Sequence, residues 1–272
     1  MTAALPAAGF DIGRVISRLF GVVSRNFVAF LLLSILLVGL PTAATSFLQL
    51  AGMYPSMAGA PGPSSYNWAA LAFLPISWLI GIAANAVLQG AVISGTVSDL
   101  SGRPVTFGEA LGTGFRFFLP LIGVGLIAGI CCFFGFLIFI VPGVLLALAW
   151  SVAAPVLVME RTGVFGAFTR SAELTRNHRG AIFALAILAG VVGFIIQALA
   201  TGIVMGGALS MANVTTAGGG GVFGIVIAQA ATTLVAQTIN ALIGSAGVAS
   251  VYYELRFVKE GVGAEQLASV FD

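Results

Sequence analysis

Charged side chains are scarce in this chain of 272 residues. Asp, Glu, Lys and Arg make up 7% of the residues, whereas 59% are apolar and the mean hydropathy is +1.11. A soluble domain carries about 25% charged residues, so this composition excludes an ordinary soluble protein. The net charge of +2 gives no reason to expect a nucleic acid or another acidic partner.

Residue types that perform catalysis or hold metals are also few. The chain has one histidine and two cysteines, and Cys131 and Cys132 are adjacent within an apolar run. A disulfide between neighbours is strained, and no second Cys pair or His cluster accompanies them to hold a metal. No Ser–His–Asp set, phosphate-binding loop or enclosed pair of carboxylates is found. The sequence therefore predicts a protein that is not an enzyme and has no cofactor.

Long apolar runs are what the chain has instead. All charged residues fall in four clusters, at 11–25, 99–116, 160–179 and 254–272, and the runs between them carry none. Charge-free runs of about 20 apolar residues are typical of transmembrane helices. We expect an all-α, polytopic membrane helix bundle with six spans, at 27–48, 68–97, 117–140, 144–159, 181–208 and 222–253.

The basic residues predict the orientation of the spans. All eleven Lys and Arg residues lie on one side, and the opposite connections at 49–67, 141–143 and 209–221 have none. Because positive residues stay inside, both termini are expected to be cytoplasmic, in a bacterial inner membrane. The first apolar run begins only at Phe27, which is late for a cleaved signal, so we expect it to remain as a span.

The charged clusters also predict a threefold repeat of about 10–100, 104–160 and 163–260, followed by a cytoplasmic tail at 261–272. Each repeat would consist of an amphipathic helix on the membrane surface and a hairpin of two spans. The even-numbered spans end alike, in Asp99, Glu160 and Glu254. Chance similarity within a small apolar alphabet is the alternative explanation.

Each surface helix has its own sequence pattern. In the first cluster the arginines share one helical face and the apolar side chains lie largely on the other. In the second, residues 106–109 form a capping box that starts a helix, with Phe107 toward lipid and Arg116 toward water. In the third, Phe165 and Phe168 oppose the charged side chains of the helix.

The third cluster contains the candidate contact residues for lipid headgroups or a partner protein: Arg170, Glu173, Arg176, His178 and Arg179. Glu173 can pair with Arg170 or Arg176, which lie three residues away on either side. Basic side chains near a leaflet attract lipid phosphate. The simpler interpretation of His178 is a surface side chain near the headgroups.

Amides and hydroxyls form a polar stripe inside the spans, and no ionisable residue accompanies them. The candidate residues of this intramembrane seam are Asn85, Gln89, Gln229, Thr233, Gln237 and Asn240, with a shorter stripe at Gln197 and Thr201. Such groups commonly hydrogen-bond across helices, and small residues allow the helices to pack closely, so helix adhesion is one interpretation. A polar cavity for a lipid or a solute is the other.

Several strings resemble the membrane domain of glycerophosphoryl diester phosphodiesterases. They are Phe-Asp-Ile-Gly at 10–13, Pro-Gly at 142–143, Ala-Pro-Val-Leu-Val-Met-Glu at 154–160, Ala-Phe-Thr-Arg-Ser-Ala-Glu-Leu-Thr at 167–175, Val-Tyr-Tyr-Glu-Leu-Arg at 251–256 and Lys-Glu-Gly at 259–261. In some members of that family the domain precedes a soluble hydrolase. The resemblance implies a membrane domain here, and we expect the hydrolase part to be missing.

These features favour a non-enzymatic inner-membrane protein that acts as a scaffold or accessory subunit linked to phospholipid metabolism. Its expected partners are the bilayer, anionic phospholipid headgroups and another membrane or cytoplasmic protein, and no nucleic acid. The alternative is a passive transporter or lipid-binding protein that uses the polar seam.

Overall fold

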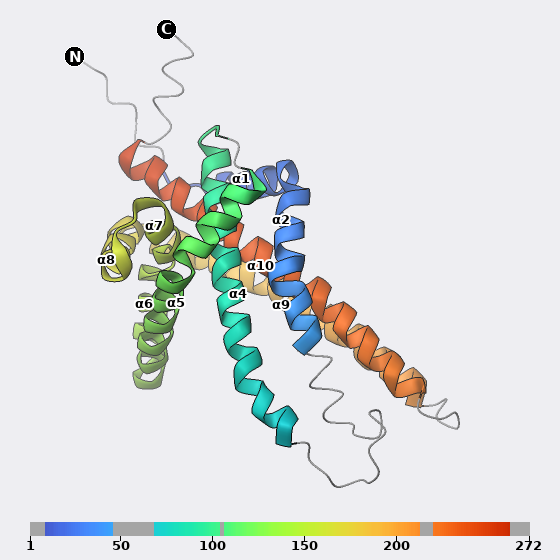
Figure 1. Cartoon of the computed structure of the whole chain (residues 1–272). Helices are drawn as coiled ribbons and strands as arrows, with labels where there is room; N and C mark the ends of the chain where they lie inside the picture. The colour runs from blue at the N-terminus through green and yellow to red at the C-terminus, as the bar shows by residue number, and fades with distance from the viewer. Residues whose placement is uncertain (1–8, 46–67, 104–105, 213–219, 262–272) are drawn as a thin grey trace, which may run out of the picture. The chain divides into compact units, whose positions relative to one another are not determined.

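The computed structural model describes residues 9–45, 68–103, 106–212 and 220–261, and these are almost entirely helical, with no strand among them (Figure 1). In chain order the elements are α1 (Ile12–Arg25), α2 (Phe27–Ser34), the π-helix η1 (Ile35–Gly39), α4 (Trp68–Leu100), α5 (Phe107–Ile138), α6 (Ile140–Ala149), α7 (Ala153–Glu160), α8 (Gly163–Thr175), α9 (Arg179–Ala212) and α10 (Gly220–Glu260). The predicted all-α class is confirmed.

Among the described residues, six helical stretches are long and apolar enough to cross a membrane: Phe27–Thr45, Pro75–Leu100, Phe107–Ile138, Ile140–Glu160, Arg179–Ile203 and Ile227–Glu260. Each corresponds to one predicted span. The chain divides into two compact units. Unit 1 contains Met1–Phe30, Ala86–Ala189 and Ile243–Asp272, and therefore all the charged residues. Unit 2 contains Leu31–Asn85 and Gly190–Leu242.

Helix α1 is a separate amphipathic helix, as predicted. Asp11 caps it, because its Oδ1 accepts hydrogen bonds from the backbone N–H groups of Gly13, at 2.7 Å, and Arg14, at 3.3 Å. The helix ends at Asn26, and α2 begins at the next residue. Its apolar face is partly internal to the protein, since Val15 and Val22 are buried.

The second charged cluster differs from the prediction. The capping box is present, with Thr106 and Glu109 bonded to each other, but no turn follows Arg116. Helix α5 instead continues for 32 residues, so there is no separate surface helix here. The start of α5 packs on α4: a Cβ added at Gly114 would lie 2.3 Å from the carbonyl oxygen of Val87. This close approach to a neighbouring helix could not be read from the local pattern.

The turn between α5 and α6 also lies earlier than predicted. Phe139, in an extended conformation, is the single residue between the two helices, and Pro142 and Gly143 lie in the first turn of α6. Proline is tolerated there because the first turn of a helix needs no N–H donor. Gly143 then allows the hairpin to close, since a Cβ at this position would meet Phe136 at 2.7 Å.

Helices α6, α7 and α8 pack as one group in unit 1. The C-terminal carbonyl of Ala149 in α6 accepts hydrogen bonds from two buried hydroxyls of α8, Ser171 at 2.8 Å and Thr175 at 3.3 Å. Phe168 is also buried, with its ring 4.5 Å from that of Trp150. Phe165 was expected on the same face as Phe168, but its side chain is exposed.

In unit 2 the first span contains a π-helical turn, where the N–H of Leu40 bonds to the carbonyl of Ile35. Pro41 follows directly, and the wider turn relieves the clash that a proline ring makes with the preceding turn. At Gly39 the backbone lies against α10: a Cβ there would be 2.6 Å from Oγ1 of Thr238.

Candidate functional site: a charged network and a polar pocket

In unit 1, each acid at the end of an even-numbered span binds an arginine from a surface helix. Asp99 of α4 pairs with Arg25 of α1, and Glu254 of α10 pairs with two further arginines of α1. Glu160 of α7 pairs with Arg170 of α8. The sequence showed the three acids as a repeated feature, but it did not show their partners.

Glu254 is the most deeply placed of the three acids. Its side chain is 0% exposed, with Oε1 2.8 Å from Nη2 of Arg14, and Arg18 contacts Oε2. The guanidinium of Arg18 also lies over the rings of Tyr253 and Phe257, at 5.1 and 5.3 Å. A buried carboxylate is costly unless it is paired and hydrogen-bonded, so these arginines allow Glu254 to remain inside.

Asp99 joins the other end of α1 to α4. Its carboxylate is 2.5 Å from Nη2 of Arg25 and accepts a 2.9 Å hydrogen bond from the side-chain amide of Asn26. The hydrogen bond to Asp99 raises the pKa of Arg25 above its ordinary value. Helix α1 is therefore held at both of its ends by acids from spanning helices.

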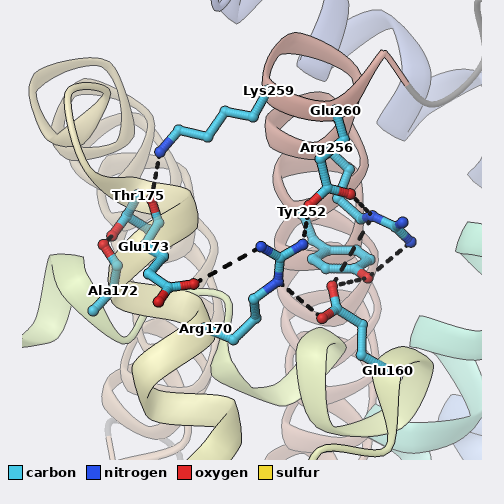
Figure 2. A network of polar contacts seen from close by, with 9 residues as sticks. All are labelled: Glu160, Arg170, Ala172, Glu173, Thr175, Tyr252, Arg256, Lys259 and Glu260. Carbon is cyan, nitrogen blue, oxygen red and sulfur yellow. Dashed lines mark hydrogen bonds and ion pairs between the residues drawn. The ribbon is translucent and has the colours of Figure 1, made fainter.

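The third group of contacts joins α7, α8 and α10 (Figure 2). Arg170 donates from Nε to Glu160 at 2.9 Å and forms a second ion pair with Glu260. The hydroxyl of the fully buried Tyr252 donates to the other oxygen of Glu160 at 2.9 Å. Arg256 completes the group through a 2.8 Å bond to Glu260. Two arginines and two glutamates thus balance each other.

Lys259 lies at the edge of this group. Its Nζ donates to the backbone carbonyl of Glu173 in the last turn of α8, which Figure 2 shows. A cation is favourable there because carbonyls at a helix C-terminus lack partners within the helix. The Glu173 side chain is 65% exposed and lies 3.9 Å from Arg170, so the predicted pairing of these two residues is present but weak.

The remaining predicted contact residues lie between α8 and α9. Arg176 is exposed, and the His178 ring lies 5.8 Å from the ring of Phe10. Burial, together with the positive charge of Lys259, lowers the pKa of His178. Nε of Arg179 is buried and has no hydrogen-bond partner in the described part of the chain. The residues that sequence reasoning missed in this network are Arg14, Arg18, Tyr252, Glu254, Arg256, Lys259 and Glu260.

The structure brings part of the intramembrane seam together in unit 2. Two turns of α9, with Gln197 and Thr201, and the α10 residues Gln229, Thr233 and Gln237 line one small pocket, together with Ala200, Thr232 and Ala236. Its volume is about 30 Å³, enough to hold an ordered water molecule. The amide of Gln229 donates to Thr233 at 3.1 Å. For Gln197 and Gln237, no protein partner is found among the described residues.

The other seam residues lie elsewhere. Asn85 is exposed and donates to the carbonyl of Gly81 in its own helix, at 3.3 Å. Gln89 is half-buried one turn later in α4 and does not line the pocket. Asn240 lies beside α9, since a Cβ added at Gly193 would be 3.4 Å from its Oδ1. The predicted stripe is therefore not one continuous path.

Comparisons of the chain with family models, with curated proteins and with solved structures find no match. In the part of the chain that the structure describes, six long apolar helices, with the charged residues gathered at helix ends, define a multi-pass integral membrane protein.

Proposed function

We propose that this integral membrane protein is a non-enzymatic scaffold or accessory subunit of a bacterial inner membrane, linked to phospholipid metabolism, with both termini in the cytoplasm. The observation that carries the proposal is the pairing of Asp99, Glu160 and Glu254 with arginines of α1 and α8. Acids that are held in such ion pairs stabilise the packing of the helices, and they are poorly placed to transfer protons in catalysis. The resemblance to a phosphodiesterase membrane domain supports the link to phospholipids.

The outer face of α8 is the docking surface that we propose for a protein partner. Phe165, Thr169 and Glu173 follow one another at four-residue spacing and are all exposed, whereas the opposite face packs on α6 and α7. Phe165 is 76% exposed, which is high for an aromatic side chain on a helix that is otherwise well packed. An aromatic anchor surrounded by polar groups is typical of protein interfaces.

The test is affinity purification of the full chain from its native membranes in a mild detergent. We expect one protein to co-purify in a fixed ratio with the parent and to fall at least about fivefold with Phe165→Ala, because aromatic hot spots contribute about 2 kcal/mol or more. Phe20→Ala is the matched control, since Phe20 is also a largely exposed phenylalanine, at 63%, on α1. A monomer that purifies alone, or equal loss in both variants, would contradict the proposal.

The pocket in unit 2 favours a second candidate function, passive passage or binding of a small neutral solute. Two of its glutamine side chains, Gln197 and Gln237, have no hydrogen-bond partner among the described residues, and they lie within a membrane-spanning region. In liposomes that contain the purified protein, water and urea would cross faster than in empty liposomes. Gln237→Leu would reduce that rate, and Thr45→Val, outside the pocket, would not. Fluxes equal to those of empty liposomes would exclude this function.

A further inference from the structure

Cations outnumber their partners where α8 meets α9. In the part of the chain that the structure describes, Arg176, Arg179 and Lys259 have no carboxylate within ion-pair distance, although nearby arginines of the network all do. Arg176 and Arg170 are close enough to act on the Lys259 ammonium. Among the described residues, the acid that acts on Lys259 is Glu173, and its mostly exposed side chain already faces Arg170. Such a surplus of positive over negative charge indicates a place for an anion.

Two further features point to the same place. Within the described ranges, the buried Nε of Arg179 is a donor without an acceptor, and buried polar groups in proteins are nearly always paired. Arg179 also begins α9, where Ile182 is the first residue whose N–H bonds back within the helix, to the carbonyl of His178. The three preceding N–H groups are left for an outside acceptor, since His178 is not a capping residue.

The space beside this turn is open, and the surface below it is apolar. A Cβ added at Gly180 would have nothing within 4 Å. Phe183 and Ile187 follow Arg179 at four-residue intervals on one face of α9, and they are 43% and 51% exposed. A cationic turn directly above an apolar stripe matches a ligand that has an anionic head and a hydrocarbon tail.

We propose that Arg176, Arg179 and Lys259, together with the first turn of α9, bind the phosphate group of an anionic phospholipid, whose acyl chain lies along Phe183 and Ile187. The phosphate accepts hydrogen bonds from the guanidinium groups and the free N–H groups, and the helix dipole favours its charge. The site lies at the start of the apolar stretch Arg179–Ile203. The end of a membrane-spanning helix is the depth at which lipid headgroups lie. The ligand is therefore a lipid and not a free phosphate ion. This site needs no protein partner, so it stands or falls separately from the proposed scaffold function.

The test uses the purified full chain in a nonionic detergent, titrated with phosphatidylglycerol, phosphatidylcholine or inorganic phosphate. Bound lipid is counted by native mass spectrometry, and thermal unfolding shows that each variant is folded. We expect phosphatidylglycerol to bind and to raise the unfolding midpoint. In the double variant Arg176→Gln/Lys259→Gln the affinity falls about tenfold, because two cations near a leaflet are lost. The single variant Arg176→Gln changes only an exposed side chain, and it gives a smaller loss of the same kind.

The control is Arg103→Gln/Arg116→Gln, which removes the same charge from two exposed arginines outside the site. This control should keep the affinity of the parent. The proposal is overturned if both double variants lose affinity equally, or if neither does. It is also overturned if phosphatidylcholine or inorganic phosphate binds as tightly as phosphatidylglycerol.

Discussion

At the scale of single residues, Glu254 shows how one buried charge fixes the position of a helix. It lies fully inside the protein on α10 and binds both Arg14 and Arg18 of α1. Helical periodicity placed the two arginines on one face of α1, which was expected to meet water. The structure turns that face toward the protein, because a buried acid 240 residues further along the chain compensates the Arg14 charge. The local sequence pattern of α1 cannot reveal a partner that lies so far away in the sequence.

Replacing Glu254 by Gln is expected to destabilise the protein by about 2 kcal/mol. Removing one partner of a buried ion pair costs about 3–5 kcal/mol, and the partial exposure of both arginines reduces this value. The unfolding midpoint in detergent should fall by about 4–8 °C. Glu109→Gln is the control, since glutamine can also complete a capping box. If the Glu254 variant unfolds at the temperature of the parent, the ion pair does not stabilise the fold.

His178 is expected to make stability depend on pH. Burial and Lys259 lower the pKa of His178 in the folded state, so below its ordinary pKa of about 6.5 the unfolded chain binds the proton more readily. The contribution of the neutral ring is complete above that value and is lost as the pH falls through the lower, folded-state pKa. The unfolding midpoint should therefore decrease between pH 7.5 and 5.

The matched variant for this prediction is His178→Gln, which cannot be protonated. Its unfolding midpoint should decrease less than that of the parent over the same pH range. Equal pH profiles for the two proteins would show that other groups, such as the carboxylates of the network, cause the dependence.

At the scale of helices, the apolar runs predicted all six spans, and amphipathic periodicity correctly predicted α1 and α8 as separate helices. The same reasoning failed for α5, which continues past Arg116 without a turn and approaches α4 closely at Gly114. It also misplaced the hairpin turn, since Pro142 was interpreted as a break although the first turn of a helix accepts proline. Both errors arise where packing or position within a helix overrides the average preference of a residue.

Two glycines of α5 allow a sharp test of that contact. Gly114→Ala is expected to cost about 1–3 kcal/mol, because the new methyl group would lie 2.3 Å from a backbone oxygen of α4 that cannot move freely. Gly112→Ala, two residues earlier, has nothing within 4 Å and should gain up to about 1 kcal/mol from helix propensity. Thermal unfolding of the two variants measures the difference. Equal effects would show that α4 and α5 are not in contact there.

At the scale of the whole molecule, the distribution of charge predicts the topology. Reporter fusions near residues 62 and 219, which lie outside the described residues, should be found on the outer side of the membrane. Fusions near residues 103, 169 and 272 should be found in the cytoplasm, because all eleven Lys and Arg residues lie on that side. A reporter at residue 272 on the outer side would contradict a chain that crosses six times. The orientation stays a prediction, since helices alone do not tell one side of a bilayer from the other.

The bond between α1 and α10 also sets an order of events during synthesis. Arg14 leaves the ribosome 240 residues before Glu254, a delay of about 12–50 seconds at usual rates of translation. Throughout that interval α1 lacks the carboxylate that later holds its two inward arginines. Helix α1 is therefore made early but gains its ion pairs with Glu254 only near the end of synthesis. In a chain truncated before residue 254, these arginines would stay unpaired and accessible to the quality-control proteases of the cell.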